Sequence, residues 1–296
     1  MKRLVFEGSA VAIITPFSDK GIDFDKLAQL IAFHIENGTD GIVICGTTGE
    51  ASTMPDSEHM AAVAFTVKEV KGRIPVIAGV GSNDTAHGID LVREATKLGA
   101  DALLNTTPYY NKTSQEGLYR HFTAMAKETD LPVILYNVPV RTALNIAPET
   151  IRRLSEIPNI VGVKECNLLQ LPDSAALCGE DMVFYSGEDG VVIPLLSLGG
   201  RGVISVVANL LPSEVSQMVH LYLEGKHAEA LRIQLDLLPL IHALFSDVSP
   251  IPIKEAMNIL GWNVGFCRMP LCEMSPEGHA ALERVLGQYT FYGLNR

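Results

Sequence analysis

The sequence has few of the features that mark membrane, secreted or nucleic-acid-binding proteins. Its 296 residues carry a formal net charge of -11, so no excess of positive charge would attract nucleic acid or an anionic membrane surface. No apolar run approaches the ~20 residues of a membrane-spanning helix. The basic residues Lys2 and Arg3 are not followed by a long apolar segment, so no signal peptide is predicted. These absences indicate a cytoplasmic protein with neither a nucleic-acid nor a membrane partner.

Cysteine is also scarce. The five cysteines are odd in number and scattered, and no two of them form a Cys-x-x-Cys pair. This pattern is typical of reduced thiols in a cytosolic protein and not of a disulfide framework or a zinc site. The histidines form no His-Glu-x-x-His pattern either. We therefore expect no metal site.

What the chain does have is a regular alternation of short apolar runs and amphipathic stretches. Eight apolar runs resemble buried strands of a parallel sheet: Val11–Phe17, Gly41–Gly46, Ile74–Gly81, Ala102–Pro108, Pro132–Val138, Ile160–Cys166, Met182–Glu188 and Gly202–Ala208. Their spacing of about 27 residues fits the ~30 residues per unit of a (β/α)8 barrel. The fold class predicted is therefore α/β, a TIM (β/α)8 barrel. A doubly wound open sheet is the alternative, but eight evenly spaced units favour closure.

The chain continues well beyond the eighth run. Helical patterns follow at Ser213–Leu223, His227–Leu244, Pro252–Leu260 and Pro276–Gln288, which is more than an eighth barrel helix requires. We therefore expect a barrel over residues 1–224. Residues 225–296 would form a helical C-terminal extension that packs on the barrel, with part of it available for subunit contacts.

One lysine differs from the others in its position. Ile160–Val163 has the pattern of a strand buried on both faces, and Lys164 closes it. An amine at the end of a buried strand loses hydration, which disfavours its charged form and leaves a neutral nucleophile for carbonyl groups. The plain alternative is a surface ion pair of Lys164 with Glu165.

Other polar side chains follow the neighbouring strands at the same end. In a (β/α)8 barrel the active site forms at the C-terminal ends of the strands. The groups that would converge there are those of the Gly46–Glu50 turn, Tyr109, Tyr110, Tyr136, Arg141, Lys164 and the Tyr185–Glu188 segment. Tyr136 and Lys164 are one βα unit apart, so their side chains would stand on neighbouring strands at similar height.

These groups suit Schiff-base chemistry on a keto acid. An amine that condenses with a keto acid needs a proton shuttle, which a neighbouring phenol can supply. The N–H groups and hydroxyls of a Thr-Thr-Gly turn can hold the carboxylate, and the resulting enamine attacks an aldehyde. Ordinary structural interpretations exist for each group: a core phenol (Tyr136), turn residues (Thr47, Thr48), interface residues (Tyr109, Tyr110) and a surface charge (Arg141).

Five motifs carry a family resemblance: Gly46-Thr47-Thr48-Gly49-Glu50, Pro108-Tyr109-Tyr110-Asn111, Tyr136-Asn137-Val138-Pro139-x-Arg141-Thr142, Gly162-Val163-Lys164-Glu165 and Gly202-Val203-Ile204-Ser205. In order and spacing they resemble the dihydrodipicolinate synthases (4-hydroxy-tetrahydrodipicolinate synthases) of the pyruvate-dependent class I aldolase superfamily. The resemblance runs from about Gly8 to about Leu271. Sialic acid lyases typically lack an arginine at the position of Arg141 and have serine at that of Thr47, so both positions look like the synthase.

The resemblance implies a role for each matching residue. Lys164 would bind pyruvate as a Schiff base. Tyr136 would transfer protons, relayed through Thr47 to Tyr110 of a neighbouring subunit. Substrate contacts would come from Thr48 (pyruvate carboxylate), Arg141 (L-aspartate-4-semialdehyde), Gly187 and Ile204 (pocket lining). The implied reaction condenses pyruvate with L-aspartate-4-semialdehyde to 4-hydroxy-tetrahydrodipicolinate in lysine and diaminopimelate biosynthesis. It would need no metal or organic cofactor and would occur in a homotetramer built as a dimer of dimers.

The resemblance also implies an effector pocket, and here the chain departs from the family. Members inhibited by lysine pair a histidine with a glutamate beside the first tyrosine of the Tyr-Tyr motif. The matching positions are Ala51, His59, Asn83, His87 and Tyr109. Because His87 replaces the acid expected to neutralise the inhibitor's ammonium, lysine feedback is not expected. Ser249 replaces an asparagine of many members, and the sequence offers no functional account of this change.

Other functions stay open at this stage. A pyruvate aldolase of the same superfamily acting on sialic acid or a keto-deoxy sugar acid is the first. A non-catalytic barrel that binds a keto acid is the second, although it would not need Tyr136 beside Lys164. A pyridoxal-phosphate enzyme also uses a lysine Schiff base, but the glycine-rich Leu198–Gly202 segment enters a strand instead of leaving one. We expect this segment to be a turn on the opposite face of the barrel.

Overall fold

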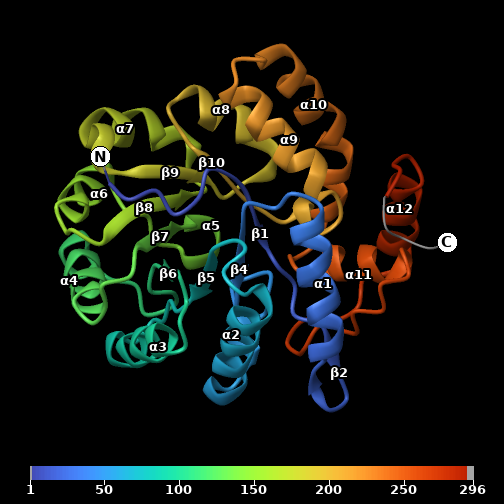
Figure 1. Ribbon diagram of the computed structural model, residues 1–296, viewed down its shortest axis with the longest axis horizontal. Coiled ribbons are helices and arrows are strands. Elements are labelled where there is room, and N and C mark those ends of the chain that lie inside the picture. Colours follow the sequence, from blue (N-terminus) through green and yellow to red (C-terminus); the bar gives the residue numbers. More distant parts are fainter. Residues whose placement is uncertain (1, 292–296) are drawn as a thin grey trace.

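The chain forms a closed barrel of eight parallel strands surrounded by helices, as the computed structural model of residues 2–291 shows (Figure 1). The strands follow one another round the barrel in chain order, and the last pairs with the first. They are β1 (Gly8–Ala12), β4 (Gly41–Ile44), β5 (Val76–Gly79), β6 (Ala102–Thr106), β7 (Val133–Asn137), β8 (Ile160–Glu165), β9 (Val183–Ser186) and β10 (Gly202–Ser205). The TIM-barrel prediction is confirmed, and closure excludes the open sheet.

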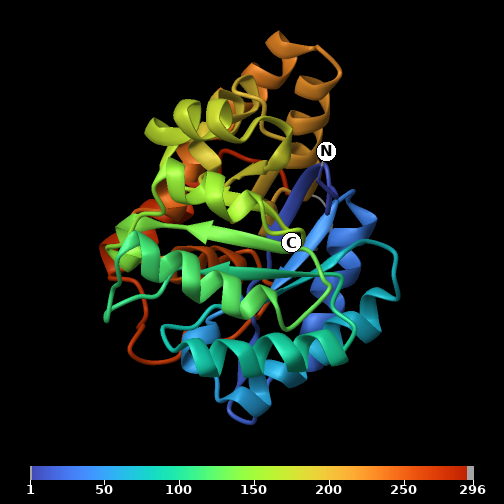
Figure 2. The ribbon, with the colours of Figure 1, turned by 90° about the vertical axis from the view of Figure 1, so that its left-hand side faces the viewer.

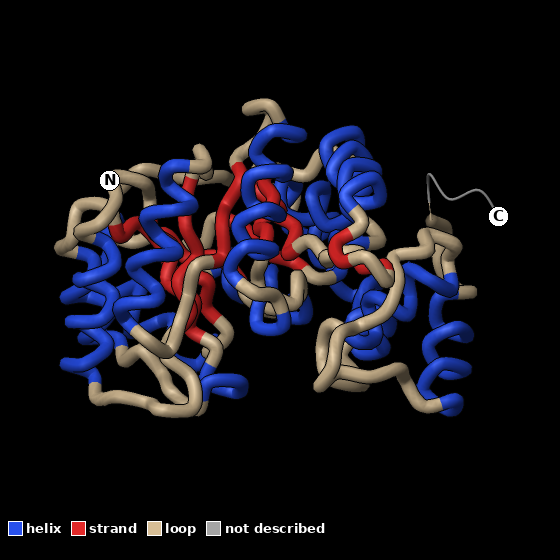
Figure 3. Tube along the Cα trace, turned by 90° about the horizontal axis from the view of Figure 1, so that it is seen from below, coloured by secondary structure: helices blue, strands red, loops and turns tan. Residues whose placement is uncertain are grey.

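Helices cover the outside of the barrel, as the view from below shows (Figure 3). They are α1 (Phe24–Glu36), α2 (Asp56–Val70), α3 (Thr85–Lys97), α4 (Gln115–Ala126), α5 (Pro139–Thr142), α6 (Pro148–Ser155), α7 (Leu171–Cys178), α8 (Val192–Ser197) and α9 (Pro212–Leu223). Three of the expected helix starts are capped by a side chain that accepts a backbone N–H of the first turn: Asp23, Asp84 and Ser114. Within residues 2–291, no helix combines the length and apolar character needed to cross a membrane.

The first strand lies earlier in the chain than predicted. The expected run, Val11–Phe17, overlaps β1 only at its start, because β1 begins at Gly8 and ends at Ala12. β1 begins with the small residues Gly8, Ser9 and Ala10, which do not form a recognisable apolar run. The apolar residues after β1 are buried for another reason. Phe17 begins the antiparallel hairpin of β2 (Phe17–Ser18) and β3 (Gly21–Ile22), which the C-terminal part of the chain covers.

Two hydrophobic cores hold the barrel together. The larger lies between the strands and the helices. The smaller fills the barrel interior with residues that include Ala10, Val43, Ile134, Tyr136 and Ile204. Burial of this apolar surface provides the main favourable term for folding.

A β-bulge in β8 decides which way the strand's last residues face. Val133 pairs with Ile160, but the next residue of β7, Ile134, pairs with Gly162, so Val161 is an extra residue. Ile160 and Val163 pack in the outer core, whereas Val161 packs inside. If the strand alternated regularly from Ile160 onward, with no bulge at Val161, Lys164 would face outward. The bulge therefore directs Lys164 into the barrel.

Three helices follow α9: α10 (His227–Leu244), α11 (Ile251–Ile259) and α12 (Pro276–Leu286). They correspond to the helical patterns expected beyond the barrel. Figures 1 and 2 show α10 (orange) beside α9 at one edge of the molecule. Trp262, just after α11, packs edge-on against Phe33 of α1 with ring centroids 5.0 Å apart. We keep the division at residues 224 and 225 as a proposal; residues 292–296 of the extension lie outside the described part.

Candidate active site

Lys164 and Tyr136 lie side by side inside the barrel, as the sequence predicts. They are register partners of β8 and β7. The Lys164 Nζ atom is 4.3 Å from the centroid of the Tyr136 ring, and both residues are buried. Among the described residues, no hydrogen-bond partner holds the Lys164 amine. The amine is therefore free to bond to a substrate carbon.

Burial sets the charge of both groups. It lowers the pKa of the Lys164 ammonium below its usual value, although Cys166 and Glu188 nearby act in the opposite direction. It also raises the pKa of the Tyr136 phenol, against the opposing effects of the Arg141 charge and the Thr47 hydroxyl. The site thus favours a neutral amine beside a protonated phenol. These are the states that a nucleophile and a proton donor need.

The turn after β4 carries two threonines, Thr47 and Thr48. The backbone N–H of Glu50 donates to the carbonyl of Thr47 at 3.1 Å and closes the turn. The hydroxyl of Thr15 donates to the carbonyl of Gly49 at 2.7 Å and holds the turn from the β1 side. The Thr47 hydroxyl acts to lower the pKa of the Tyr136 phenol, against the larger effect of burial. Thr48 is buried.

Gly187 and Ile204 complete the surroundings of the lysine. A Cβ atom on Gly187 would lie 2.3 Å from the Cys166 sulfur and 3.2 Å from the Lys164 Cγ, so no larger residue fits there without a shift. Ile204 belongs to the same interior cluster as Tyr136. Both residues therefore lie where a pocket around Lys164 would need them.

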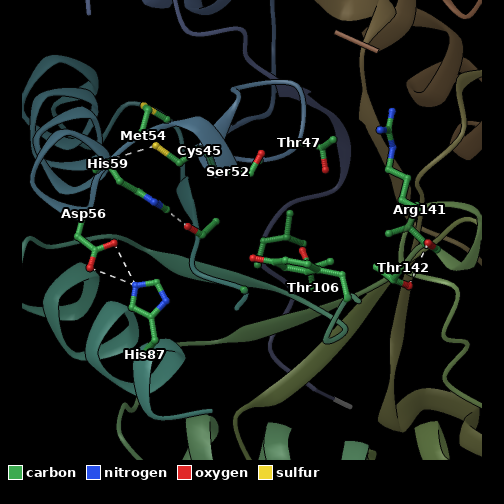
Figure 4. A pocket seen from close by; sticks show the side chains of 17 residues that line it. Cys45, Thr47, Ser52, Met54, Asp56, His59, His87, Thr106, Arg141 and Thr142 are labelled. Carbon is green, nitrogen blue, oxygen red and sulfur yellow. Dashed lines mark hydrogen bonds and ion pairs between the residues drawn. The ribbon is translucent and has the colours of Figure 1, made fainter. Parts of the chain in front are cut away.

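A cavity of about 370 Å³ is lined by residues that follow β4 and β7 and by residues of α2 and α3 (Figure 4). Figure 4 shows Asp56, His59 and His87 on one side of it and Arg141 and Thr142 on the other. Of the predicted site residues, those that line it are Thr47, Ala51, His59, His87, Tyr109 and Arg141. Those that do not are Thr48, Asn83, Tyr110, Tyr136, Lys164, Gly187 and Ile204. The cavity thus joins the predicted semialdehyde site to the predicted effector pocket.

The two histidines of the effector pocket differ in their partners. His59 is buried, which lowers its pKa, and its Nε2 donates to the carbonyl of Gly79 at 2.8 Å. The Nε2 of His87 is 3.0 Å from a carboxylate oxygen of Asp56. The sequence interpretation noted that an acid is missing at position 87 but overlooked Asp56. Its place one helical turn before His59 in α2 could have revealed it.

The Tyr109–Tyr110 segment lies at the edge of the cavity. The side-chain amide of Asn83 donates to the Tyr109 carbonyl at 3.2 Å. Tyr110 has a positive φ of 68° and is 93% exposed, so its ring does not reach into the cavity of its own chain. The structure therefore separates Tyr110 from the other candidate catalytic residues of the same chain.

Arg141 is positioned by a contact that the sequence does not reveal. It lies in the short helix α5, which begins at Pro139. Its Nη2 donates to the backbone carbonyl of Ser249 at 3.3 Å. Ser249 thus touches the site through its main chain, which any residue type at this position also has.

Two other sequence interpretations can now be judged. Tyr185 was grouped with the polar rim, but this was wrong: its phenol donates to the carbonyl of Phe6 at 2.9 Å and its ring stacks on Phe6. The Leu198–Gly202 turn lies at the opposite end of the barrel, as expected, where Arg201 pairs with Glu7 at 3.2 Å. Within residues 2–291, no group of three or more histidine, cysteine or acidic residues is arranged to hold a metal ion.

Comparison with known proteins gives full-length matches. Residues 5–289 match the model of the Dihydrodipicolinate synthetase family. The 4-hydroxy-tetrahydrodipicolinate synthase of Acetivibrio thermocellus is 53% identical over 289 residues, which cover 98% of this chain and 99% of that protein. The crystal structure of dihydrodipicolinate synthase from Aquifex aeolicus superposes with a TM-score of 0.94 at 44% identity, covering 96% of this chain and 98% of that one. The crystal structure of dihydrodipicolinate synthase from Thermotoga maritima superposes with a TM-score of 0.94 at 38% identity, covering 96% of this chain and 99% of that one.

Proposed function

We infer the function from one premise: the chain belongs to the Dihydrodipicolinate synthetase family. We propose that it condenses pyruvate with L-aspartate-4-semialdehyde to 4-hydroxy-tetrahydrodipicolinate, as a lyase of lysine and diaminopimelate biosynthesis. The observation that carries this proposal is the buried Lys164 amine 4.3 Å from the centre of the Tyr136 ring.

The proposed chemistry begins with attack of the neutral Lys164 amine on the keto carbon of pyruvate. A carbinolamine forms, and a proton from Tyr136 allows its hydroxyl to leave as water, which gives the Schiff base. Loss of a methyl proton gives an enamine, whose carbon forms the new bond to the aldehyde carbon while the aldehyde oxygen takes up a proton and becomes the hydroxyl. The amino group of the semialdehyde then adds to the imine carbon and displaces the Lys164 amine, which closes the ring and frees the lysine. Thr47 would pass the proton of Tyr136 onward.

The substrate carboxylates need donors on both sides of the reacting carbons. We assign the pyruvate carboxylate to Thr48 and the turn that carries it. Arg141 borders the cavity with its guanidinium and would receive the carboxylate of the semialdehyde by charge-assisted hydrogen bonds. Gly187 and Ile204 would line the pyruvate side.

We also propose a cytoplasmic homotetramer, built as a dimer of dimers, in which Tyr110 completes the proton relay of a neighbouring subunit. Two observations support this assembly. Tyr110 is 93% exposed and does not line the cavity of its own chain. Leu169 is 94% exposed, which for a large apolar side chain favours contact with another copy.

The role of the effector pocket stays a prediction. An ammonium entering it would meet the Asp56 carboxylate, but His87 already contacts that group at 3.0 Å. We therefore expect lysine to inhibit turnover weakly at most. A lysine titration of the reaction rate checks this, and inhibition at micromolar lysine would contradict it.

Trapping with borohydride tests the proposed mechanism. Incubation with pyruvate and borohydride, followed by peptide mass mapping, should place the adduct on Lys164. Lys164→Ala should remove the adduct, whereas Lys97→Ala, at an exposed helical lysine, should retain it. An adduct on another lysine, or none, would refute the mechanism.

The second substrate needs its own assay. We expect L-aspartate-4-semialdehyde to react best in a panel of aldehydes that includes those of sialic acid and keto-deoxy sugar acids. Arg141→Ala should mainly damage use of the semialdehyde and leave pyruvate trapping intact. Equal loss of both activities would contradict the role of Arg141, and preference for a sugar aldehyde would favour the alternative aldolase.

A further inference from the structure

One segment of the C-terminal extension reaches the rim of the active site at two points. The Ser249 carbonyl accepts the hydrogen bond from Arg141 at 3.3 Å. In α11, the Nζ of Lys254 donates to Oε1 of Glu50 at 2.8 Å. Glu50 follows β4 and Arg141 follows β7, so this short segment bridges two separate loops of the rim.

The Glu50–Lys254 ion pair is buried and fully partnered. Glu50 is 2% exposed and Lys254 is 1% exposed. The Lys254 ammonium also donates to the Phe266 carbonyl at 2.5 Å and lies 4.5 Å from the centroid of the Phe17 ring. The second carboxylate oxygen of Glu50 accepts the backbone N–H of Arg268 at 2.8 Å. Removing one partner would leave the other charge buried without compensation.

The backbone around this ion pair is closely packed. The N–H of Phe17 donates to the Val264 carbonyl at 3.1 Å. Gly265 has a φ of 79°, and a Cβ atom there would lie 1.8 Å from the Phe17 carbonyl oxygen. The segment after α11 is therefore seated directly on the β2–β3 hairpin, and Lys254 is held from both sides.

Glu50 holds the turn that carries Thr47 and Thr48. Its N–H closes the turn on the Thr47 carbonyl. Glu50 itself has a φ of 55°, a left-handed conformation that is rare for a residue with a side chain and persists only where its surroundings enforce it. The contacts of its carboxylate with Lys254 and Arg268 supply that enforcement.

We propose that Lys254 is a positioning residue for the reaction. Through Glu50 it holds the Gly46–Glu50 turn so that Thr47 meets Tyr136 and Thr48 meets pyruvate. This inference rests on the proposed function, which assigns both threonines to the reaction.

Two variants test the role. Lys254→Met removes the ammonium and keeps the apolar stem, and Glu50→Gln keeps the shape of the carboxylate and removes its charge. At temperatures well below unfolding, we expect each to lower kcat at least about tenfold and to raise KM for pyruvate, because a misplaced turn harms both threonine contacts. Borohydride trapping on Lys164 should remain detectable. The double variant should be no slower than the slower single one, because both act through one contact.

Arg268→Met is the matched control. It breaks the ion pair with Glu58 of α2, in which Arg268 Nη2 lies 2.8 Å from Oε1, and the weaker contact of Arg268 Nη1 with the Thr53 carbonyl at 3.5 Å. It keeps the backbone N–H that Glu50 accepts. We expect its kcat to stay within about twofold of wild type, although its unfolding temperature falls.

Several outcomes would overturn the positioning role. One is a folded Glu50→Gln or Lys254→Met protein with wild-type kcat and KM; should Lys254→Met not fold, Glu50→Gln decides alone. Another is an equal loss in Arg268→Met, which would indicate general loosening. If wild type itself forms no pyruvate adduct on Lys164, the proposed function fails and the positioning role with it.

Discussion

The position of Gly187 shows how much a single atom decides at this site. A Cβ there would meet the Cys166 sulfur at 2.3 Å and the Lys164 stem at 3.2 Å. The lysine can occupy its place between Tyr136 and the barrel wall because Gly187 has no side chain. The position of the Lys164 amine thus depends on packing around its stem and not only on the charges near it.

Gly187→Ala should therefore displace the Lys164 stem. We expect the rate of pyruvate trapping to fall about tenfold, because small displacements of a reacting group are costly. Adding Cys166→Ala removes the nearest obstacle and should restore part of the rate, while Cys166→Ala alone should trap at close to the wild-type rate. A double variant no faster than Gly187→Ala would show that the sulfur is not the obstacle.

Most of the site could be predicted from the types of residue at the strand ends and their spacing in the sequence. Lys164 and Tyr136 could be placed together because strand ends in a barrel converge and the two residues are one unit apart. Ser249 could not be predicted because it acts through its carbonyl, which every residue has. Lys254 was overlooked because nothing in the sequence shows that a lysine near residue 250 returns to Glu50.

At the scale of the elements, one buried carboxylate joins the ends of β7 and β8. Glu165, next to the nucleophile, accepts hydrogen bonds from the Asn137 side chain at 2.8 Å, the Asn167 N–H at 2.7 Å and the Gln170 side chain at 2.9 Å. Burial nevertheless raises the pKa of Glu165 to about 7, against the effect of these bonds. The loops after both strands are therefore held by hydrogen bonds to the Glu165 carboxyl, whose pKa is about 7.

This shift predicts a pH-dependent stability. The pKa of Glu165 is higher in the folded than in the unfolded chain, so its contribution is complete below pH about 4.5 and is lost as the pH rises through about 7. The loss is on the order of 3 kcal/mol by pH 8. Thermal unfolding of wild type and Glu165→Gln should therefore diverge between pH 5 and pH 8, with the variant gaining on wild type.

The comparison needs a control at an exposed carboxylate. Glu283→Gln, on the outer face of α12, should differ from wild type by nearly the same amount at every pH. A constant difference for Glu165→Gln as well would contradict the titration of a buried carboxyl in the folded state.

The bounds of some helices and strands were predicted better than those of others. Helices with a capping side chain and a clear apolar stripe, such as α1, begin where expected. β1 was misplaced because Gly8, Ser9 and Ala10 do not form an obviously apolar run. The bulge at Val161 cannot be seen in the sequence at all, because all of Ile160–Val163 is compatible with either face of a buried strand.

At the scale of the whole molecule, Tyr110 is 93% exposed and does not line the cavity of its own chain. Barrel closure could be predicted from the even spacing of eight units. The exposure of Leu169 could not be predicted, since exposed apolar residues differ from core residues only once the fold is known. Tyr110 was already expected from the family resemblance to act in a neighbouring subunit, whereas Leu169 became a candidate for subunit contacts only through its exposure.

Subunit mixing tests whether Tyr110 acts in a neighbour's site. Tyr110→Phe and Lys164→Ala should each be nearly inactive alone. When the two are dissociated and reassociated together, a mixed dimer has one site with wild-type Lys164 and the partner's wild-type Tyr110. Equal mixing should restore about one quarter of the wild-type activity. No recovery in a verified mixed assembly would show that Tyr110 serves its own chain or has no catalytic role.

The bridge from Lys254 to Glu50 also has a consequence for the order in which the protein is made. The last strand ends at Ser205 and the eighth barrel helix at Leu223, so the whole barrel sequence is synthesised before α11 and the segment that follows it. The loops that carry Glu50 and Arg141 gain their partners only when the segment from Ser249 to Arg268 has emerged from the ribosome. We therefore expect the barrel strands to pair before these loops are fixed in place.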